Sequence, residues 1–254
     1  MPNPTAFILL DEPTMLDAAR IRDSLAAGHP GVPLSMPEDN DPAGAIVLNC
    51  AGSVVVVMNI TARLPDGWQQ VANRAAMHWP DAEGACARHR GHLIVSVMGE
   101  SKDRLQSIRI VTAVAGALVA THPRCIAILL NSVANSRQIF SEFSCSAFAP
   151  YPDFPTELWV SMHPFRDSAS RIGVLTMGLR DFVGREIELE GPASQLKPLL
   201  TTARGLVAYL LQAGITVRDG DTIGASATER IPVRLLDSHR FQGLQVFAAS
   251  LPAT

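Results

Sequence analysis

The order of apolar and helical segments in the first 100 residues limits the fold of this chain most narrowly. Short apolar runs of strand character alternate with segments in which apolar residues recur at helical spacing. The predicted order is strand, helix, strand, strand, helix, strand, over residues 6–12, 13–31, 45–49, 54–61, 65–80 and 92–100. The glycine-containing link at residues 51–53 indicates a hairpin between two of these strands. This order predicts a ferredoxin-like (βαββαβ) arrangement.

Residues 101–254 predict a second half that again mixes strands and helices. The helical pattern of residues 101–123 has such a broad apolar surface that the helix is expected to lie buried between layers. Strands are predicted at residues 125–131, 157–165, 171–179, 185–191, 231–238 and 244–250, and a further helix at 192–214. We therefore expect an α+β protein of two related, α/β-sandwich-like halves, 1–100 and 101–254, with antiparallel or mixed sheets. One continuous domain is the alternative.

The charge balance and the cysteines exclude several classes of function. Lys and Arg number 21 against 24 Asp and Glu, so the chain has no basic field for nucleic acid. The longest nearly apolar run, residues 110–120, is shorter than the ~20 residues that span a bilayer, and no signal peptide is recognised. The four cysteines form no closely spaced pair. We expect a cytoplasmic protein with free thiols that binds neither nucleic acid nor membranes.

The stretch TMGLRDFVGREIELEG, from Thr176 to Gly191, is the most densely patterned part of the chain. If its end is a strand, Glu186, Glu188 and Glu190 share one face at a spacing of ~7 Å. Carboxylates so placed could hold a hard cation or act as an acid and base pair. A solvated strand face is the favoured interpretation. Arg180, in the glycine-flanked turn before the strand, can pair with an acidic neighbour.

A second set of candidates is Cys86, His89 and His92, which recur at intervals of three. On one helix such residues are neighbours, so they could share a soft metal ion. Gly91 interrupts that geometry, and His92 is expected to begin a strand. A partly buried histidine at a helix end is therefore the favoured interpretation, and no metal site is predicted.

Sequence motifs for common chemistries are missing from the chain. It has no G-x-S-x-G elbow, no G-x-G-x-x-G fingerprint and no phosphate-binding P-loop. We therefore predict no catalytic residue and no cofactor.

Aromatic residues gather in an irregular, proline-rich stretch between residues 131 and 155. An exposed aromatic loop at residues 140–155 would be a natural surface for a protein partner. The candidate contact residues are Phe140, Phe143, Phe148 and Tyr151, with Trp159 just beyond. A role for Trp159 in the core is the favoured alternative.

Three segments, HRGHLIVSVMG, PTELWVSMHPF and IGVLTMGLRDFVGREIELEG, resemble an uncharacterised bacterial family, a domain of unknown function of the 4261 type. The family pattern T-x-G-L-x-x-F-x-x-x-E-I-E is matched by Thr176, Gly178, Leu179, Phe182, Glu186, Ile187 and Glu188. The resemblance runs over most of the chain. It implies a bacterial, soluble α+β accessory protein, and it brings no activity, catalytic residue or cofactor.

These observations favour a non-enzymatic protein-binding module of the immunity or adaptor type. The alternative is a metal-dependent or small-molecule-binding enzyme that uses the strand with Glu186, Glu188 and Glu190. A homodimer formed by pairing of edge strands is a third interpretation.

Overall fold

The computed structural model describes residues 3–37, 41, 44–99, 103–214, 217–224 and 230–252. The chain divides into two compact units, Met1–Trp159 and Val160–Thr254. The sequence pattern predicts a division after residue 100, before the long helix α4 (Arg104–Thr121). In the structure α4 packs on β1 (Thr5–Leu10) and β5 (Gly91–Val97), so it belongs to the first unit.

The N-terminal unit is built on a seven-stranded sheet in which every paired strand is antiparallel. The strands lie in the order β2 (Leu34–Ser35), β3 (Ala45–Cys50), β4 (Ser53–Ile60), β5, β1, β6 (Cys125–Leu130) and β7 (Val133–Ser136). The predicted hairpin is confirmed, since β3 and β4 pair in full across residues 51 and 52. The ferredoxin-like arrangement is not confirmed, because β5 lies between β1 and β4 and the sheet continues past β1 into β6.

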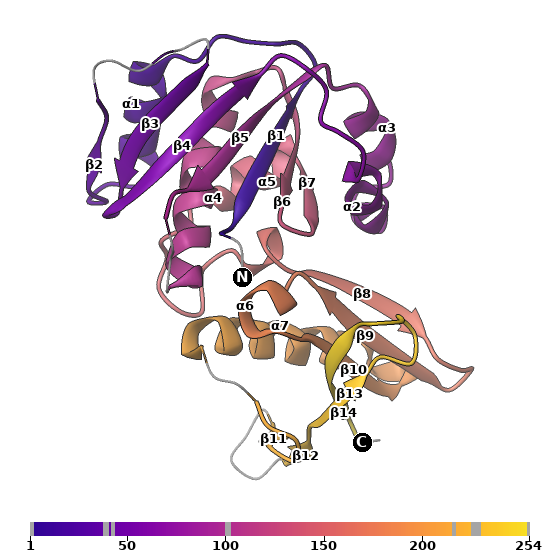
Figure 1. The fold of residues 1–254 in the computed structure, drawn as a ribbon. Coiled ribbons are helices and arrows are strands. Elements are labelled where there is room, and N and C mark those ends of the chain that lie inside the picture. Colours follow the sequence, from indigo (N-terminus) through magenta and orange to yellow (C-terminus); the bar gives the residue numbers. More distant parts are fainter. Residues whose placement is uncertain are drawn as a thin grey trace. The chain divides into compact units, whose positions relative to one another are not determined.

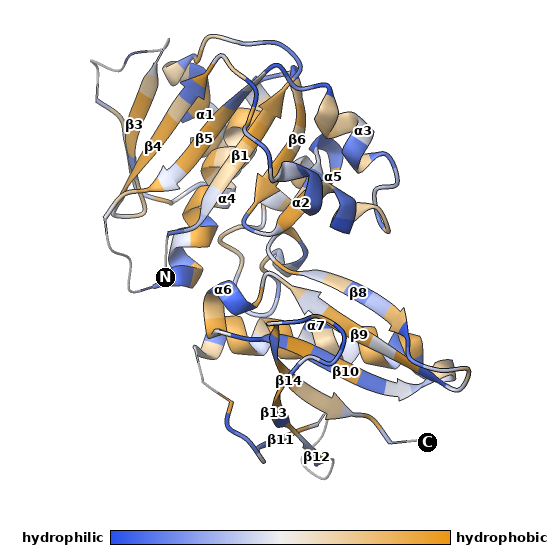
Figure 2. Cartoon of the chain, turned by 45° about the vertical axis from the view of Figure 1, so that its right-hand side comes forward, coloured by the Kyte–Doolittle hydropathy of each residue, from blue (hydrophilic) through white to orange (hydrophobic). Residues whose placement is uncertain are grey.

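One face of this sheet is covered along its middle by α4, which α1 (Ala18–Gly28) and α5 (Arg137–Ser144) flank. Helix α4 is buried along almost its whole length, as the sequence predicts, and Figure 2 shows it apolar on several sides. Along the strands beneath α4, successive side chains point to alternate faces of the sheet, as expected. In β4, for example, Val55 and Val57 are buried under the helices, whereas Val54 and Met58 point to the opposite face.

The opposite face is covered only at one end. Helices α2 (Trp68–Ala75) and α3 (Ala82–Ala87) pack over β6 and β7, and Figures 1 and 2 show β3 and β4 uncovered on this side. Val54 is 42% exposed and Met58 is 37% exposed there. Apolar side chains on a sheet face lose their hydrophobic stabilisation when no layer covers them. This open apolar face is the first feature of the structure that indicates a binding surface.

The C-terminal unit has a mixed five-stranded sheet. Its order is β13 (Arg234–Asp237), β14 (Gln245–Ser250), β10 (Glu186–Pro192), β9 (Arg171–Met177) and β8 (Ser161–Arg166), and β10 and β14 are parallel. Helix α7 (Leu196–Ala213) packs on β9 and β10. This unit also contains α6 (Arg180–Val183), the hairpin of β11 (Thr222–Ile223) and β12 (Ile231–Pro232), and the 3₁₀ turn Ala193–Gln195, whereas the 3₁₀ turn Thr156–Leu158 lies in the N-terminal unit. The α+β class is confirmed, but the strand orders of the two units differ.

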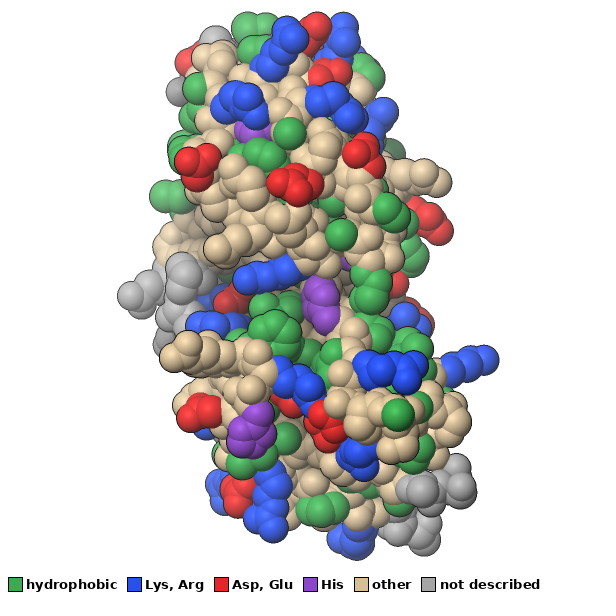
Figure 3. Space-filling view, turned by 90° about the vertical axis from the view of Figure 1, so that its right-hand side faces the viewer, with side chains coloured by type: hydrophobic (Ala, Val, Ile, Leu, Met, Phe, Trp, Pro, Cys, Tyr) green, Lys and Arg blue, Asp and Glu red, His purple; other side chains and the backbone are tan. Residues whose placement is uncertain are grey.

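The surface carries both signs of charge. On the face shown in Figure 3, basic and acidic side chains are interspersed over each unit. Within the described residues, none of the helices has both the length and the hydropathy needed to cross a bilayer.

Candidate functional site

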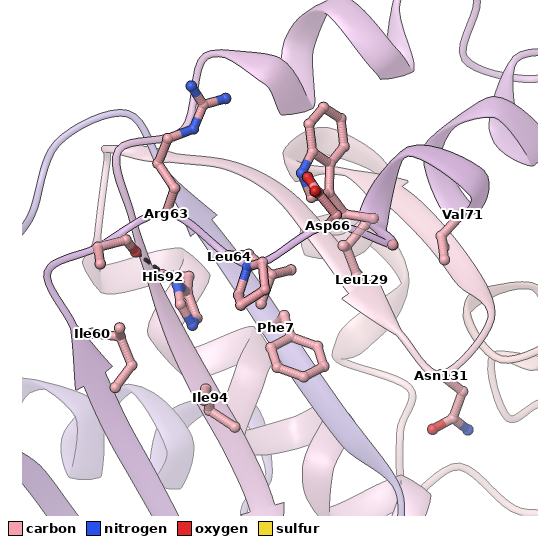
Figure 4. A pocket seen from close by; sticks show the side chains of 14 residues that line it. Phe7, Ile60, Arg63, Leu64, Asp66, Val71, His92, Ile94, Leu129 and Asn131 are labelled. Atoms are coloured by element: carbon pink, nitrogen blue, oxygen red, sulfur yellow. Dashed lines mark hydrogen bonds between the residues drawn. The ribbon is translucent and has the colours of Figure 1, made fainter.

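The open face of the large sheet contains a cavity of about 690 Å³, which we call the sheet-face cavity (Figure 4). It lies where residues 61–67 leave the end of β4 and lead into α2. Its apolar lining comes from four strands, this connecting loop and α2, with Phe7, Ile60, Leu64, Val71, Ile94 and Leu129. A volume of this size lies in the range of pockets that bind small molecules or partner side chains.

His89 holds the loop that forms one wall of the sheet-face cavity. The backbone N–H of Leu64 donates a 2.9 Å hydrogen bond to its Nε2, and its Nδ1 lies 2.6 Å from the carbonyl oxygen of Cys86. A carbonyl oxygen can only accept, so the proton sits on Nδ1 and the ring connects α3 with the loop. Trp68 meets the His89 ring edge-on at 5.6 Å. His89 therefore supports the cavity from outside.

His92 lines the cavity itself, at the start of β5. Its Nδ1 donates to the carbonyl oxygen of Ala62 at 2.9 Å, which leaves Nε2 without a proton when the ring is neutral. Figure 4 shows this second nitrogen on the side of the ring turned away from the dashed hydrogen bond, toward Ile94 and Phe7. Burial lowers the pKa of His92 from its ordinary value of 6.5, because the charged ring loses its hydration. His92 thus gives the cavity a hydrogen-bond acceptor.

The buried histidines predict a pH dependence of stability. Burial also lowers the pKa of His29, so both rings are neutral in the folded state and take up protons more readily when unfolded. The free energy of unfolding should therefore fall as the pH drops below about 6.5, by at most about 1.4 kcal/mol per pH unit for each histidine. Urea unfolding of the parent and of His92→Phe between pH 7.5 and 5 tests this, and parallel curves would contradict the assignment to His92.

The three residues weighed as metal ligands separate in the structure. Cys86 is fully buried in the core with Trp68 and Ala72, and burial raises the pKa of its thiol to about 11. His89 is engaged with Leu64, and His92 faces the sheet-face cavity. Among the described residues, no group of three or more His, Cys, Asp or Glu side chains is placed to hold a metal ion. The expected strand start at His92 is confirmed, since β5 begins at Gly91.

Glu186 organises the turn before β10. Its carboxylate is fully buried and accepts four hydrogen bonds, which come from the Thr176 hydroxyl and from the backbone N–H groups of Gly178, Leu179 and Arg180 at 2.7–3.2 Å. The Thr176 oxygen in turn accepts from the N–H of Ile187. Burial raises the pKa of Glu186, and the four donors act in the opposite direction because they favour the ionised form. A carboxylate has about four lone-pair sites, so this network occupies all of them.

Glu188 and Glu190 are paired rather than solvated. Glu188 accepts from the Ser238 hydroxyl at 2.8 Å and lies 3.6 Å from Nε of Arg240. Glu190 pairs with Arg171 and Arg240 at 3.2 and 3.1 Å. Both glutamates border a cavity of about 320 Å³ beside β13 and β14. Arg180 donates through its backbone to Glu186, while its side chain is exposed.

The aromatic stretch is largely part of the core of the N-terminal unit. Phe140 lies in α5 and is fully buried, and Trp159 is buried with its Nε1 donating to the Thr112 hydroxyl at 2.8 Å. Phe143 and Phe148 are half-buried, and Tyr151 is exposed. The segment from 131 to 155 is also less irregular than expected, because it contains β7 and α5. These residues are not brought together as one aromatic surface.

Sequence reasoning missed the sheet-face cavity because its lining comes from distant parts of the chain. Phe7, residues 60–71, His92 and Leu129 converge only through the pairing of β4, β5, β1 and β6. One available signal was the strand of residues 54–60, where apolar residues stand at successive positions instead of alternating with polar ones. Such a run predicts two apolar faces, and the helices cover only one.

Comparison with known proteins identifies one family. Residues 175–247 match the family described as domain of unknown function DUF4261. This range lies within the C-terminal unit and contains the network of Glu186. No curated protein matches the chain. No solved structure matches it either.

Proposed function

We propose that this chain, which carries a domain of the DUF4261 type, is a non-enzymatic binding module that holds an apolar element of a protein partner. The observation that carries the proposal is the sheet-face cavity, which continues through the pairing of β5, β4 and β3 onto the open face of β3 and β4. Contiguous apolar surface of this kind typically marks an interaction site. The alternative, an enzyme that uses the glutamates of β10, has less support, because the acceptor sites of the buried Glu186 carboxylate are already occupied.

The open face is continuous with the cavity. Met58 pairs with Ile94 across β4 and β5, and Ile60 pairs with His92. Val56 and Val47 form the next pair outward, on β4 and β3. A partner that inserts a side chain in the cavity can therefore cover the neighbouring strands with its flanking residues. A buried anchor surrounded by a rim that excludes water is the usual energetic arrangement of an interface.

Site-specific photocrosslinking tests this proposal. A photoreactive phenylalanine analogue at Met58 is expected to give a discrete crosslinked protein in cells that naturally contain the chain, and the same analogue at Met77 is not. Met77 is a matched control because it is an exposed methionine of the same unit, beyond the end of α2. The variant Met58→Lys should weaken capture of the identified partner at least about tenfold, since a charge would have to be buried.

Two outcomes would contradict the proposal. Equal crosslinking from Met58 and Met77 would remove the specificity of the open face. A product containing two copies of this chain would replace a separate partner with a homodimer.

A further inference from the structure

We propose that the sheet-face cavity recognises an aromatic ring that carries one neutral hydrogen-bond donor, such as the indole of a tryptophan or the phenol of a tyrosine in the partner. The inference rests on the proposed binding function and names the group that this function requires. It follows from the polar atom, the ring walls and the charges of the cavity.

Two uncharged polar side chains line the cavity, His92 and Asn131, and the Nδ2 of Asn131 is buried without a hydrogen-bond partner. The polar atom that His92 offers is an acceptor. Ala62 fixes the proton of His92 on Nδ1, so Nε2 offers a lone pair. The His92 ring is only 3% exposed, and Nε2 has no hydrogen-bond partner among the described residues. An occupant without a donor would bury this acceptor unpaired, and that costs free energy. The site therefore discriminates in favour of an N–H or O–H group.

The walls of the cavity favour a planar ring. Phe7 and His92 stand with ring centroids 6.2 Å apart and planes tilted by 53°, and Trp68 lines the same cavity. Aromatic rings at such distances interact through tilted and offset arrangements that a further ring can extend. Ile94 and Leu129 supply flat aliphatic contacts on the neighbouring strands. An aromatic occupant thus gains contact area on several sides at little conformational cost.

The charged residues at the rim do not favour a charged occupant. Arg63 is exposed and donates to the carbonyl oxygen of Ala87, and Figure 4 shows it pointing away from Phe7 and Ile94. Asp66 is exposed and accepts from Gln69. The interior of the cavity presents apolar carbon, the neutral ring of His92 and the uncharged amide of Asn131. Burying a full charge there would carry a large desolvation cost.

Indole and 1-methylindole are matched probes for this inference. They have the same ring system, but only indole has an N–H donor. Titration of the full chain with each probe, followed by the NMR signals of backbone amides in residues 60–71 and 91–97, gives the two dissociation constants. We expect indole to bind about fivefold more tightly, which is the contribution of one hydrogen bond to a buried acceptor. In His92→Phe, which keeps a ring and removes the acceptor, the ratio should fall to about one.

The variant Ile94→Trp fills the cavity and should abolish the shifts caused by both probes. Equal affinity of the two probes for the parent protein, with both lost in Ile94→Trp, would overturn the donor requirement and leave the proposed binding function standing. Absence of shifts in residues 60–71 and 91–97 with either probe would overturn the aromatic assignment. Loss of Met58 crosslinking, by contrast, would count against the binding function itself. The comparison of probes in the parent protein needs no variant to fold.

Discussion

Replacing Glu186 with glutamine is expected to lower the free energy of unfolding of the C-terminal unit by about 3 kcal/mol. The carboxylate accepts from four donors, two at each oxygen. A glutamine side chain has one oxygen, so its NH₂ group faces two donors that lose their acceptor. Buried donors without partners cost about 1–3 kcal/mol each, and hydrogen bonds to a charged group are the stronger kind. The melting temperature of this unit should fall by roughly 12 °C or more.

Hydrogen exchange monitored by mass spectrometry measures this effect in the correct unit, because peptides from residues 175–191 report on the network directly. The three tryptophans, Trp68, Trp79 and Trp159, all lie in the N-terminal unit. Tryptophan fluorescence therefore follows the unfolding of that unit and serves as the internal reference. Glu190→Gln is the matched control on the same strand. Its ion pairs are partly exposed, so we expect a change of at most about 1 kcal/mol. Equal destabilisation by the two variants would show that Glu186 has no special role.

The network of Glu186 explains the pattern through which the sequence resembles the DUF4261 family. Thr176 bonds to both Glu186 and Ile187, and Gly178 and Gly184 adopt positive φ values of 110° and 84° on either side of α6. Glycine accepts such angles without strain. The pattern therefore encodes a turn held by a buried carboxylate. A densely patterned motif can be needed for the fold alone, so its presence does not by itself identify a reaction.

The sequence predicts local structure well where the apolar residues recur with one clear spacing, either that of a helix or that of a strand. The hairpin of β3 and β4, the buried helix α4 and the strand β5 all follow from spacing and turn chemistry. The order of strands in the sheet does not follow, because pairing depends on contacts between residues far apart in the chain. Thus β5 was expected to complete a four-stranded sheet, yet it lies between β1 and β4 in a sheet of seven.

The candidate site was only partly accessible to sequence reasoning. The intervals between Cys86, His89 and His92 suggest a metal site. Gly91 correctly indicates that the helix ends and a strand begins before His92. The partners of the two histidines, Ala62 and Leu64, lie 25–30 residues earlier in the chain. Which nitrogen carries the proton depends on those partners, and this decides what each ring can bind.

Replacing His89 with alanine should reduce the free energy of unfolding of the N-terminal unit by about 3 kcal/mol. The change removes a ring that is 1% exposed, so it leaves a cavity beside Trp68, and it takes away the partners of the Leu64 N–H and the Cys86 carbonyl. Urea unfolding followed by tryptophan fluorescence measures the loss. For a unit of this size the melting temperature should drop by roughly 9 °C.

His78→Ala is the matched control, because His78 is an exposed histidine of the same unit, and it should change stability by less than about 0.5 kcal/mol. Below the unfolding transition, His89→Ala should also weaken indole binding, since residues 61–67 form a wall of the sheet-face cavity and His89 fixes that wall. His89 does not line the cavity, so a loss of binding would have to act through the loop. If His89→Ala were as stable as the His78 variant, the loop would be held by other contacts. Unchanged indole binding in a destabilised variant would instead show that the wall keeps its shape without His89.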